Sequence, residues 1–542
     1  MSPSARPLSH SASIAAAFLA AAERSPDKPC LLFEGERITY AQLRDQALRW
    51  AAALRAWGLR PQERVALYLE NSPTFLASYL GTHLASGIVV LVNTQYRQVE
   101  LRHILSDSAA RLCLTDAAGQ AELARVSHEL TALEQVIVAD TAASFLAVAQ
   151  PAELPPPNPD DVAVLAYTSG TTGRAKGAML THANLVANSA AVTQAWRWSA
   201  DDTLLLALPL FHVHGLCVGM HGTWLLGANA ELHRRFDATA IYDRLLADGR
   251  PQPGQGHGEG QVQAHRHHQG HDQGRITMFF GVPTMYTRLI AEAERRLAAG
   301  EPLPAPLRLY VSGSAPLSVH TFETFERLFG QRILERYGMS ETIMNLTNPY
   351  DGERRPGTVG MPFPGQQARI VDVRTRAPIH HETPGEIQVR GPHVFKGYWQ
   401  RPDATADAFA DDGWFNTGDL GWRSADGYFT ISGRARELII TGGYNVYPRE
   451  VEEVLQTHPA VAEAAVLGLP DSEFGEQIAA AVVLEPGVTA TAATAEQLVD
   501  HCRDQLASYK KPRRIFFVES LPRNAMGKIQ KHVLKEQLDH QA

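Results

Sequence analysis

A loop rich in small and hydroxyl-bearing residues is the first candidate for chemistry in this chain. Residues 167–180 read YTSGTTGRAKGAML. Small residues let backbone N–H groups converge on phosphate oxygens, hydroxyls add donors, and a lysine adds positive charge. The spacing is not that of a P-loop NTPase, because Ala175 stands where the second glycine would be. The alternative is an ordinary flexible surface loop. We predict that the phosphate-binding residues are Thr168, Ser169, Gly170, Thr171, Thr172, Gly173 and Lys176.

Four further segments follow this loop in order along the chain. They read ERYGMSET at 335–342, GWFNTGDLG at 413–421, GRARELIITGGYNVYPRE at 433–450 and PRNAMGK at 522–528. Together with the loop, they resemble the AMP-forming, adenylate-forming superfamily of acyl-CoA synthetases, luciferases and peptide-synthetase adenylation domains. The resemblance extends from about residue 13 to about residue 535. It implies that the protein uses ATP, Mg²⁺ and coenzyme A.

The implied chemistry starts from the fact that a carboxylate is a poor electrophile. Transfer to the α-phosphate of ATP creates an acyl-adenylate with a good leaving group, which requires phosphate neutralisation, a metal and positioning. Glu341 can supply one carboxylate to Mg²⁺. Asp419 and Arg434 can bind the ribose hydroxyls, and Tyr337 offers a flat face to adenine. Each of these residues also has an ordinary alternative, as a helix-cap acid, a turn Asp, a surface Arg or a core Tyr. The motif around them implies further nucleotide contacts from Glu335, Arg336, Gly338, Met339 and Ser340.

Lys528, near the C-terminus, would ordinarily be a solvated surface charge. In the resembling family this position reaches over the active site during adenylation, and a point charge on a flexible stem suits a residue that must arrive and leave. The resemblance also places a hinge at Arg436, where Asp or Lys is more usual, and a pantetheine tunnel at Gly442 and Gly443. The implied cycle alternates two positions of a small domain, one for each half-reaction. On the same resemblance we assign catalysis to Lys528, Glu341 and Thr172.

The acid substrate is indicated by Arg288, which stands in an apolar segment that reads as a strand entering a helix. Such an arginine is either a helix-surface residue or the bidentate partner of a second carboxylate on the substrate. With His214 and Ser314 it matches the residues that hold the distal carboxylate in malonyl-CoA synthetases. We therefore predict a malonate–CoA ligase, with methylmalonate as a second substrate. The alternatives are a synthetase for another short or aryl acid and an inactive nucleotide-binding homologue.

Composition limits the remaining classes of protein. At roughly 100–200 residues per domain, 542 residues predict more than one domain. With 50 basic and 58 acidic residues the net charge is −8, which argues against nucleic-acid binding. The four cysteines form no CxxC pair, a pattern typical of a reducing compartment.

The apolar segments do not predict a membrane span. The strongest candidate, 203–230, contains a proline and three histidines and reads better as a buried strand and helix. The run at 14–22 predicts an amphipathic helix rather than a signal peptide. We expect a cytoplasmic protein without membrane insertion. A mitochondrial location is the alternative, because the first 22 residues contain no acid. The oligomeric state stays open.

The elements that must hold these residues alternate between helical patterns and short β-rich runs. Strand-like runs at 64–68, 88–92, 112–115 and 136–139, separated by helical stretches such as 41–57, predict α/β layers with mostly parallel strands. Runs at 427–431 and 437–440 read as strands of a more antiparallel region. A smaller unit follows, with helices at 448–456 and 494–506 and strands at 461–467 and 478–484. We predict a large N-terminal domain at 1–435 and, from the resemblance, a small mobile α+β lid domain at 436–542.

One segment has a different composition from the rest of the chain. Residues 249–274 read GRPQPGQGHGEGQVQAHRHHQGHDQG and cannot bury enough apolar surface to offset the entropy of ordering. We predict a disordered insertion at 250–274, or a local reading-frame error in the gene. Metal binding is the alternative, although no fixed spacing or orienting acid accompanies the histidines. These histidines are His257, His265, His267, His268 and His271.

Overall fold

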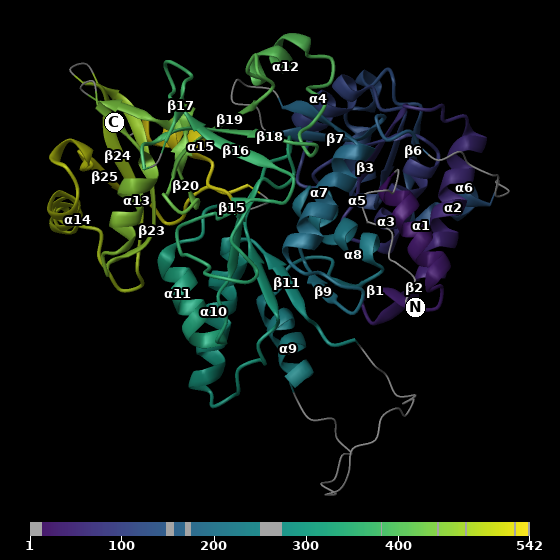
Figure 1. Cartoon of the computed structure of the whole chain (residues 1–542), viewed down its shortest axis with the longest axis horizontal. Coiled ribbons are helices and arrows are strands. Elements are labelled where there is room, and N and C mark those ends of the chain that lie inside the picture. Colours follow the sequence, from purple (N-terminus) through teal and green to yellow (C-terminus); the bar gives the residue numbers. More distant parts are fainter. Residues whose placement is uncertain are drawn as a thin grey trace, which may run out of the picture.

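The computed structural model describes residues 13–147, 157–168, 175–249, 274–380, 382–441, 444–471, 474–524 and 527–539. These residues form four sheets with helices packed against them (Figure 1). Three sheets precede residue 435, and the fourth belongs to a smaller unit at the C-terminal end. No helix within the described ranges combines the length and the apolar content needed to cross a bilayer. The predicted fold class, a large N-terminal α/β part with mainly parallel sheets and a smaller C-terminal domain, is confirmed.

A six-stranded sheet contains the two strands that flank the phosphate loop. Its order is β6-β5-β3-β4-β7-β8, and every pair is parallel except β7 with β8. The strands are short and largely buried apolar runs, as expected where helices cover both faces. Their bounds are β3 (Arg64–Tyr68), β4 (Ile88–Leu91), β5 (Leu112–Thr115), β6 (Gln135–Val138), β7 (Val162–Thr168) and β8 (Lys176–Thr181).

A nine-stranded sheet carries most of the remaining predicted site. Its order is β15-β14-β13-β12-β11-β9-β10-β1-β2, with a parallel centre and antiparallel strands at both edges. The carboxyl ends of parallel strands meet at one edge of a sheet, which is where ligands bind in open α/β folds. The bounds are β1 (Pro29–Phe33), β2 (Glu36–Thr39), β9 (Thr203–Leu206), β10 (Asn229–Leu232), β11 (Met278–Gly281), β12 (Leu309–Ser312), β13 (Leu334–Tyr337), β14 (Leu346–Thr347) and β15 (Met361–Pro362).

Local signals explain several helix ends. Thr39 and Gln42 form a capping box at the start of α2 (Tyr40–Trp57), and the left-handed Gly58 ends that helix. Helix α10 (Pro283–Ala298) begins with a proline, whose missing N–H is not needed there. The other helices before residue 435 are α1 (Ile14–Arg24), α3 (Pro73–Leu84), α4 (Gln98–Ser108), α5 (Ala117–Ala124), α6 (Ala143–Leu146), α7 (His182–Ala195), α8 (His221–Leu226), α9 (Ala238–Gly249), α11 (Val319–Phe329) and α12 (Pro402–Ala408). A π-helical segment, η4, covers His214–Met220, and 3₁₀ turns cover η2 (Ser127–Glu129) and η3 (Ala139–Thr141).

The last two sheets are mainly antiparallel. One has the order β17-β16-β18-β19-β20, and the C-terminal one has the order β22-β21-β24-β23 with β25 parallel to β24. A 3₁₀ turn, η5 (Ala435–Glu437), joins them. The strands are β16 (Gln367–Val371), β17 (Pro378–Ile379), β18 (Gly385–Arg390), β19 (Phe415–Arg423), β20 (Phe429–Arg434), β21 (Ile439–Thr441), β22 (Tyr444–Val446), β23 (Val461–Asp471), β24 (Gly475–Leu484) and β25 (Arg514–Phe517). The C-terminal helices are α13 (Pro448–Gln456), α14 (Ala492–Gln505) and α15 (Lys531–Asp539), with a 3₁₀ turn η6 (Ser508–Lys510).

The predicted elements match the structure most closely where local signals are strong. The helix predicted at 448–456 is α13, residue for residue. The strands predicted at 427–431 and 437–440 start too early. A turn that ends at the positive-φ Gly427 delays β20, and η5 delays β21. The predicted insertion at 250–274 lies outside the described residues except for Gly274.

Candidate active site

The turn after β13 positions the acidic residue of the ERYGMSET motif. Gly338 packs so tightly on the carbonyl of Ile343 that any Cβ would clash with it. The N–H of Ile343 donates to the carbonyl of Met339 at 2.7 Å, and Ile343 adopts φ +60°, which is strained for a β-branched residue. This tight turn holds Glu341 in a buried position between β13 and the segment before α12.

Tyr337, Asp419 and Arg434 form one polar cluster. The hydroxyl of Tyr337 donates to Oδ2 of Asp419, and Nε of Arg434 lies 2.6 Å from Oδ1 of the same carboxylate. Asp419 and Arg434 face each other across β19 and β20, whereas Tyr337 comes from β13 in another sheet. The neighbouring Asp419 raises the pKa of Arg434, and burial raises the pKa of Tyr337 well above its usual value. A charged carboxylate held in this way can accept hydrogen bonds from ribose hydroxyls.

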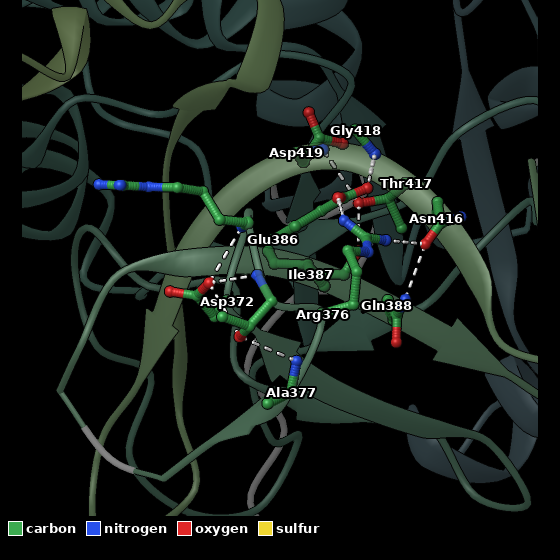
Figure 2. A network of polar contacts seen from close by, with 12 residues as sticks. Asp372, Arg376, Ala377, Glu386, Ile387, Gln388, Asn416, Thr417, Gly418 and Asp419 are labelled. Carbon is green, nitrogen blue, oxygen red and sulfur yellow. Dashed lines mark hydrogen bonds and ion pairs between the residues drawn. The ribbon is translucent and has the colours of Figure 1, made fainter. Parts of the chain in front are cut away.

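A network of polar contacts holds the part of β19 that carries Asp419 (Figure 2). The N–H of Asp419 donates to the hydroxyl of Thr417 at 3.0 Å, and that hydroxyl donates to the carbonyl of Ile387 on β18 at 2.7 Å. The N–H of Gly418 donates to Oε1 of Glu386 at 3.1 Å, and Arg376 bridges Glu386 to Asn416. The network therefore fixes the backbone of β19 from Thr417 to Asp419.

Glu341 is linked to the phosphate loop through an aromatic side chain. Its Oε1 accepts a hydrogen bond of 3.0 Å from the hydroxyl of Tyr398, and Nζ of Lys176 lies 5.2 Å from the centre of the Tyr398 ring. Burial raises the pKa of Glu341, so a cation beside it would stabilise the charged form. One buried carboxylate fits Mg²⁺, which takes few protein ligands beside phosphates and water. Among the described residues no group of three or more His, Cys, Asp or Glu side chains could hold a metal.

The phosphate loop connects two strand ends that the sheet brings together. Thr168 pairs with Lys176 across β7 and β8, and the Thr168 hydroxyl donates to the Lys176 carbonyl at 3.5 Å. The predicted residues Ser169, Gly170, Thr171, Thr172 and Gly173 lie between them, outside the described residues. Gly442 and Gly443, predicted to line the pantetheine tunnel, also lie outside the described residues.

His214 and Ser314, predicted to bind the acid, lie together. The hydroxyl of Ser314 is 3.3 Å from Nδ1 of His214, although 100 residues separate them. His214 is fully buried, and burial together with the nearby guanidinium of Arg336 lowers its pKa well below the usual value. Ser314 follows β12 with φ +70°, a strained conformation for a residue other than glycine. The pair is therefore a polar group with a neutral, buried imidazole and a partly exposed hydroxyl.

Arg288, the third residue predicted to bind the acid, lies apart from this pair. It is exposed on α10 and lines a cavity of about 750 Å³ whose wall also includes Val282, Phe211 and Gly527. Neither His214 nor Ser314 is among the described residues of that wall, and no hydrogen bond or ion pair in the described chain joins Arg288 to them.

The predicted catalytic lysine belongs to a turn at the same cavity. The N–H of Lys528 donates to Oδ1 of Asn524 at 3.0 Å, and Asn524 and Gly527 line the cavity wall. Gly527, with φ +72°, packs against Thr284 at the start of α10, where a Cβ would come within 2.8 Å of the threonine hydroxyl oxygen. The small domain thus brings the Lys528 turn to the N-terminal end of α10, close to Arg288.

The remaining motif residues lie on β13 and its turn. Glu335 and Arg336 are both buried, whereas Met339 and Ser340 are partly exposed. Tyr398 and Thr417, which support Glu341 and Asp419, are functional residues that the sequence did not predict. Thr417 stands in the GWFNTGDLG segment, where proximity to a motif is the available signal, whereas Tyr398 lies outside the five motif segments.

Comparisons with known proteins show the family of the chain. The model of the AMP-binding enzyme family matches residues 18–251 and 257–399, and that of the AMP-binding enzyme C-terminal domain matches 450–528. A malonate–CoA ligase of Arabidopsis thaliana is 33% identical, over 98% of this chain and 90% of that protein. A sulfoacetate–CoA ligase of Cupriavidus necator is 37% identical, over 96% of each. The ATP-bound structure of MatB from Rhodopseudomonas palustris superposes with a TM-score of 0.86 at 37% identity, covering 97% of this chain and 99% of that one.

Proposed function

Because the chain belongs to the AMP-binding enzyme family and is an AMP-forming acid–CoA ligase, we propose that its acid substrate is malonate. The products are then malonyl-CoA, AMP and pyrophosphate. The observation that carries the proposal is the hydrogen-bonded pair of His214, which is fully buried, and Ser314, which is partly exposed. A monocarboxylic acid with an apolar chain gains nothing from such a pair, whereas a second carboxylate accepts hydrogen bonds from it.

The reaction has two steps. A carboxylate oxygen of malonate attacks the α-phosphorus of ATP and pyrophosphate leaves, which forms malonyl-adenylate. The sulfur of coenzyme A then attacks the acyl carbon and AMP leaves. Asp419 and Arg434 hold the ribose, Tyr337 holds Asp419 in place, and Lys176 lies at the end of the phosphate loop.

Glu341 is the residue that would hold Mg²⁺. The ion, when bound, neutralises phosphate charge during adenylation. Tyr398 orients the Glu341 carboxylate through its hydroxyl. Thr172, in the phosphate loop, keeps the catalytic role that the family resemblance implies.

The small domain supplies the two remaining parts of the cycle. Lys528 contacts the reacting carboxylate and the α-phosphate during adenylation, which the packing of the Lys528 turn against Thr284 supports. Rotation about Arg436, in the turn between β20 and β21, then brings Gly442 and Gly443 to the pantetheine arm of coenzyme A. The domains accordingly divide between residues 435 and 436.

Arg288→Ala tests the role in acid binding that the family resemblance implies for Arg288. If that role is right, malonate-dependent AMP formation is expected to fall at least about 100-fold, while the KM for ATP changes less than about threefold. Arg295→Ala is the matched control, since Arg295 lies on the same helix and pairs with Glu292. Normal malonate turnover by the Arg288→Ala enzyme contradicts a role of Arg288 at the distal carboxylate.

Sulfoacetate is the second candidate, favoured by the 37% identity to the Cupriavidus necator enzyme. Its sulfonate would take the place of the distal carboxylate. Pyrophosphate release measured with malonate, methylmalonate, sulfoacetate, acetate and propionate separates these substrates. A higher kcat/KM for sulfoacetate or for a monocarboxylic acid than for malonate refutes malonate as the substrate.

A further inference from the structure

Strand β13 presents its motif residues to two different sides. Successive side chains of a strand point to opposite faces, so Arg336 faces away from Glu335 and Tyr337. Tyr337 reaches the nucleotide cluster through Asp419. Leu334, on the same face as Arg336, lies in register with Val311 of β12 and, through it, with Phe280 of β11. The ring of Phe280 stacks against that of His214, with the ring centres 6.3 Å apart. Arg336 therefore lies on the acid side of the strand and not on the nucleotide side that its motif suggests.

Arg336 is a buried cation without a partner in the described chain. Its exposed fraction is 3%, and neither Nε nor Nη2 has a hydrogen-bond acceptor among the described residues. No ion pair of the described residues includes it, and burial lowers its pKa to about 9. A buried charge without a partner destabilises the folded protein. A site that retains such a charge therefore fits the binding of an anion, which supplies the missing partner.

The guanidinium lies against the residues expected to bind the acid. A Cβ on Gly313 would come within 2.5 Å of Cζ of Arg336, so the glycine before Ser314 leaves the room that the guanidinium occupies. The positive charge of Arg336 helps to lower the pKa values of both His212 and His214, which places it close to these rings. The His214–Ser314 pair thus has a buried cation beside it, whereas Arg288 does not contact the pair.

The neighbouring acid compensates this cation only in part. Glu335 is adjacent in sequence but points to the other face of β13, where its Oε1 accepts a hydrogen bond from the N–H of Leu317. Burial raises the pKa of Glu335 to about 7, so much of this carboxyl is protonated at neutral pH. The neutral histidines and the serine near Arg336 add no negative charge of their own.

We propose that Arg336 binds the distal anionic group of the acid substrate from inside the protein, together with His214 and Ser314. This inference rests on the proposed function, because it requires a substrate with two acidic groups. Arg336 is then a specificity-determining residue for both a carboxylate and a sulfonate. A monocarboxylic acid leaves the guanidinium unpaired, and sites built around such a polar partner reject analogues by factors of up to about 10⁴.

The test compares Arg336→Gln with the wild type on the same set of acids. We expect kcat/KM for malonate to fall at least about 100-fold, mainly through KM, while kcat/KM for propionate is unchanged or rises. Because the variant removes an unpaired buried charge, the melting temperature without substrate is expected to stay the same or rise. The rise in melting temperature that malonate causes in the wild type is expected to disappear.

Arg354→Gln is the matched control. Arg354 is also a buried arginine of the large domain, but it donates to the backbone carbonyls of Arg332, Pro349 and Tyr350. Its replacement should lower the melting temperature and leave the ratio of malonate to propionate activity unchanged. A purely structural role for Arg336 would make Arg336→Gln behave in the same way, which would overturn the inference.

The outcomes separate this inference from the proposed function. If the wild type prefers another acid with two anionic groups, malonate is not the substrate. The ratio of activity with the preferred acid to activity with propionate is then measured instead. Retention of that preference by Arg336→Gln overturns the role of Arg336 while the function stands. A wild-type preference for a monocarboxylic acid overturns both.

Discussion

Replacing Glu335 with glutamine measures how much the burial of this carboxyl group lowers the free energy of unfolding. Glu335 is 2% exposed on β13, its Oε1 accepts the N–H of Leu317 at 3.0 Å, and its Oε2 has no hydrogen-bond partner among the described residues. Burial is the largest influence on its pKa and raises it from 4.5 to about 7, although the positive charge of Arg449 opposes the rise. Glutamine has the shape of the protonated acid and cannot ionise.

The sign of the pH dependence follows from the raised pKa. Between pH 4.5 and about 7 the unfolded chain releases a proton that the folded chain still holds, so the stability contributed by Glu335 is complete below pH 4.5 and is lost as the pH rises towards 7. At about 1.4 kcal/mol for each tenfold change in proton affinity, the whole loss is about 3 kcal/mol. About 2.5 kcal/mol of it develops between pH 5 and pH 8.

The measurement is urea unfolding of the wild type and Glu335→Gln at several pH values, followed by tryptophan fluorescence. All eight tryptophans precede residue 435, so the signal reports on the large domain. We expect the free energy of unfolding of the variant, relative to the wild type, to rise by about 2.5 kcal/mol from pH 5 to pH 8. Glu323→Gln, at an exposed position on α11, is the control and should follow the wild-type curve. A difference between Glu335→Gln and wild type that is the same at every pH would refute the reasoning.

Two further predictions concern the nucleotide site and Lys528. Asp419→Asn weakens the ion pair with Arg434 and removes the charged acceptor of the Tyr337 hydroxyl. The KM for ATP is therefore expected to rise about 10- to 100-fold in the pyrophosphate-release assay. A change below about threefold would contradict the ribose-binding role. Lys528→Ala is expected to slow adenylation at least about 100-fold and to leave thioester formation from synthetic malonyl-adenylate and coenzyme A within about fivefold of wild type. Equal loss of both half-reactions would show that Lys528 does not act in adenylation alone.

Local sequence signals account for the elements that the chain forms from neighbouring residues. Helix α13 was predicted to the residue because Pro448 starts it and its apolar residues repeat at helical spacing. Strand β20 was displaced because the preceding turn reaches Gly427, and turn lengths are weakly specified by residue type.

The site is less accessible to sequence reasoning because its contacts join distant segments. Tyr398 donates to Glu341 from 57 residues away, and its ring lies near Lys176, more than 200 residues earlier. The motif residues Arg336 and Tyr337 are adjacent in sequence, yet strand geometry sends them to different sides of β13. The structure brings His214 and Ser314 together, whereas Arg288 lines a cavity whose described wall includes neither of them.

The order and residue types of the motifs were enough to identify the family and the α/β architecture, because backbone preference, apolar periodicity and phosphate-binding loops are encoded over short stretches of chain. Only the tertiary structure decided which charges meet. Whether a guanidinium pairs with a carboxylate, as Arg434 does with Asp419, or stays buried and unpaired, as Arg336 does among the described residues, depends on strands brought together from separate parts of the chain. The electrostatic energy of each group depends on that burial and on those neighbours, and neither is a property of the residue itself.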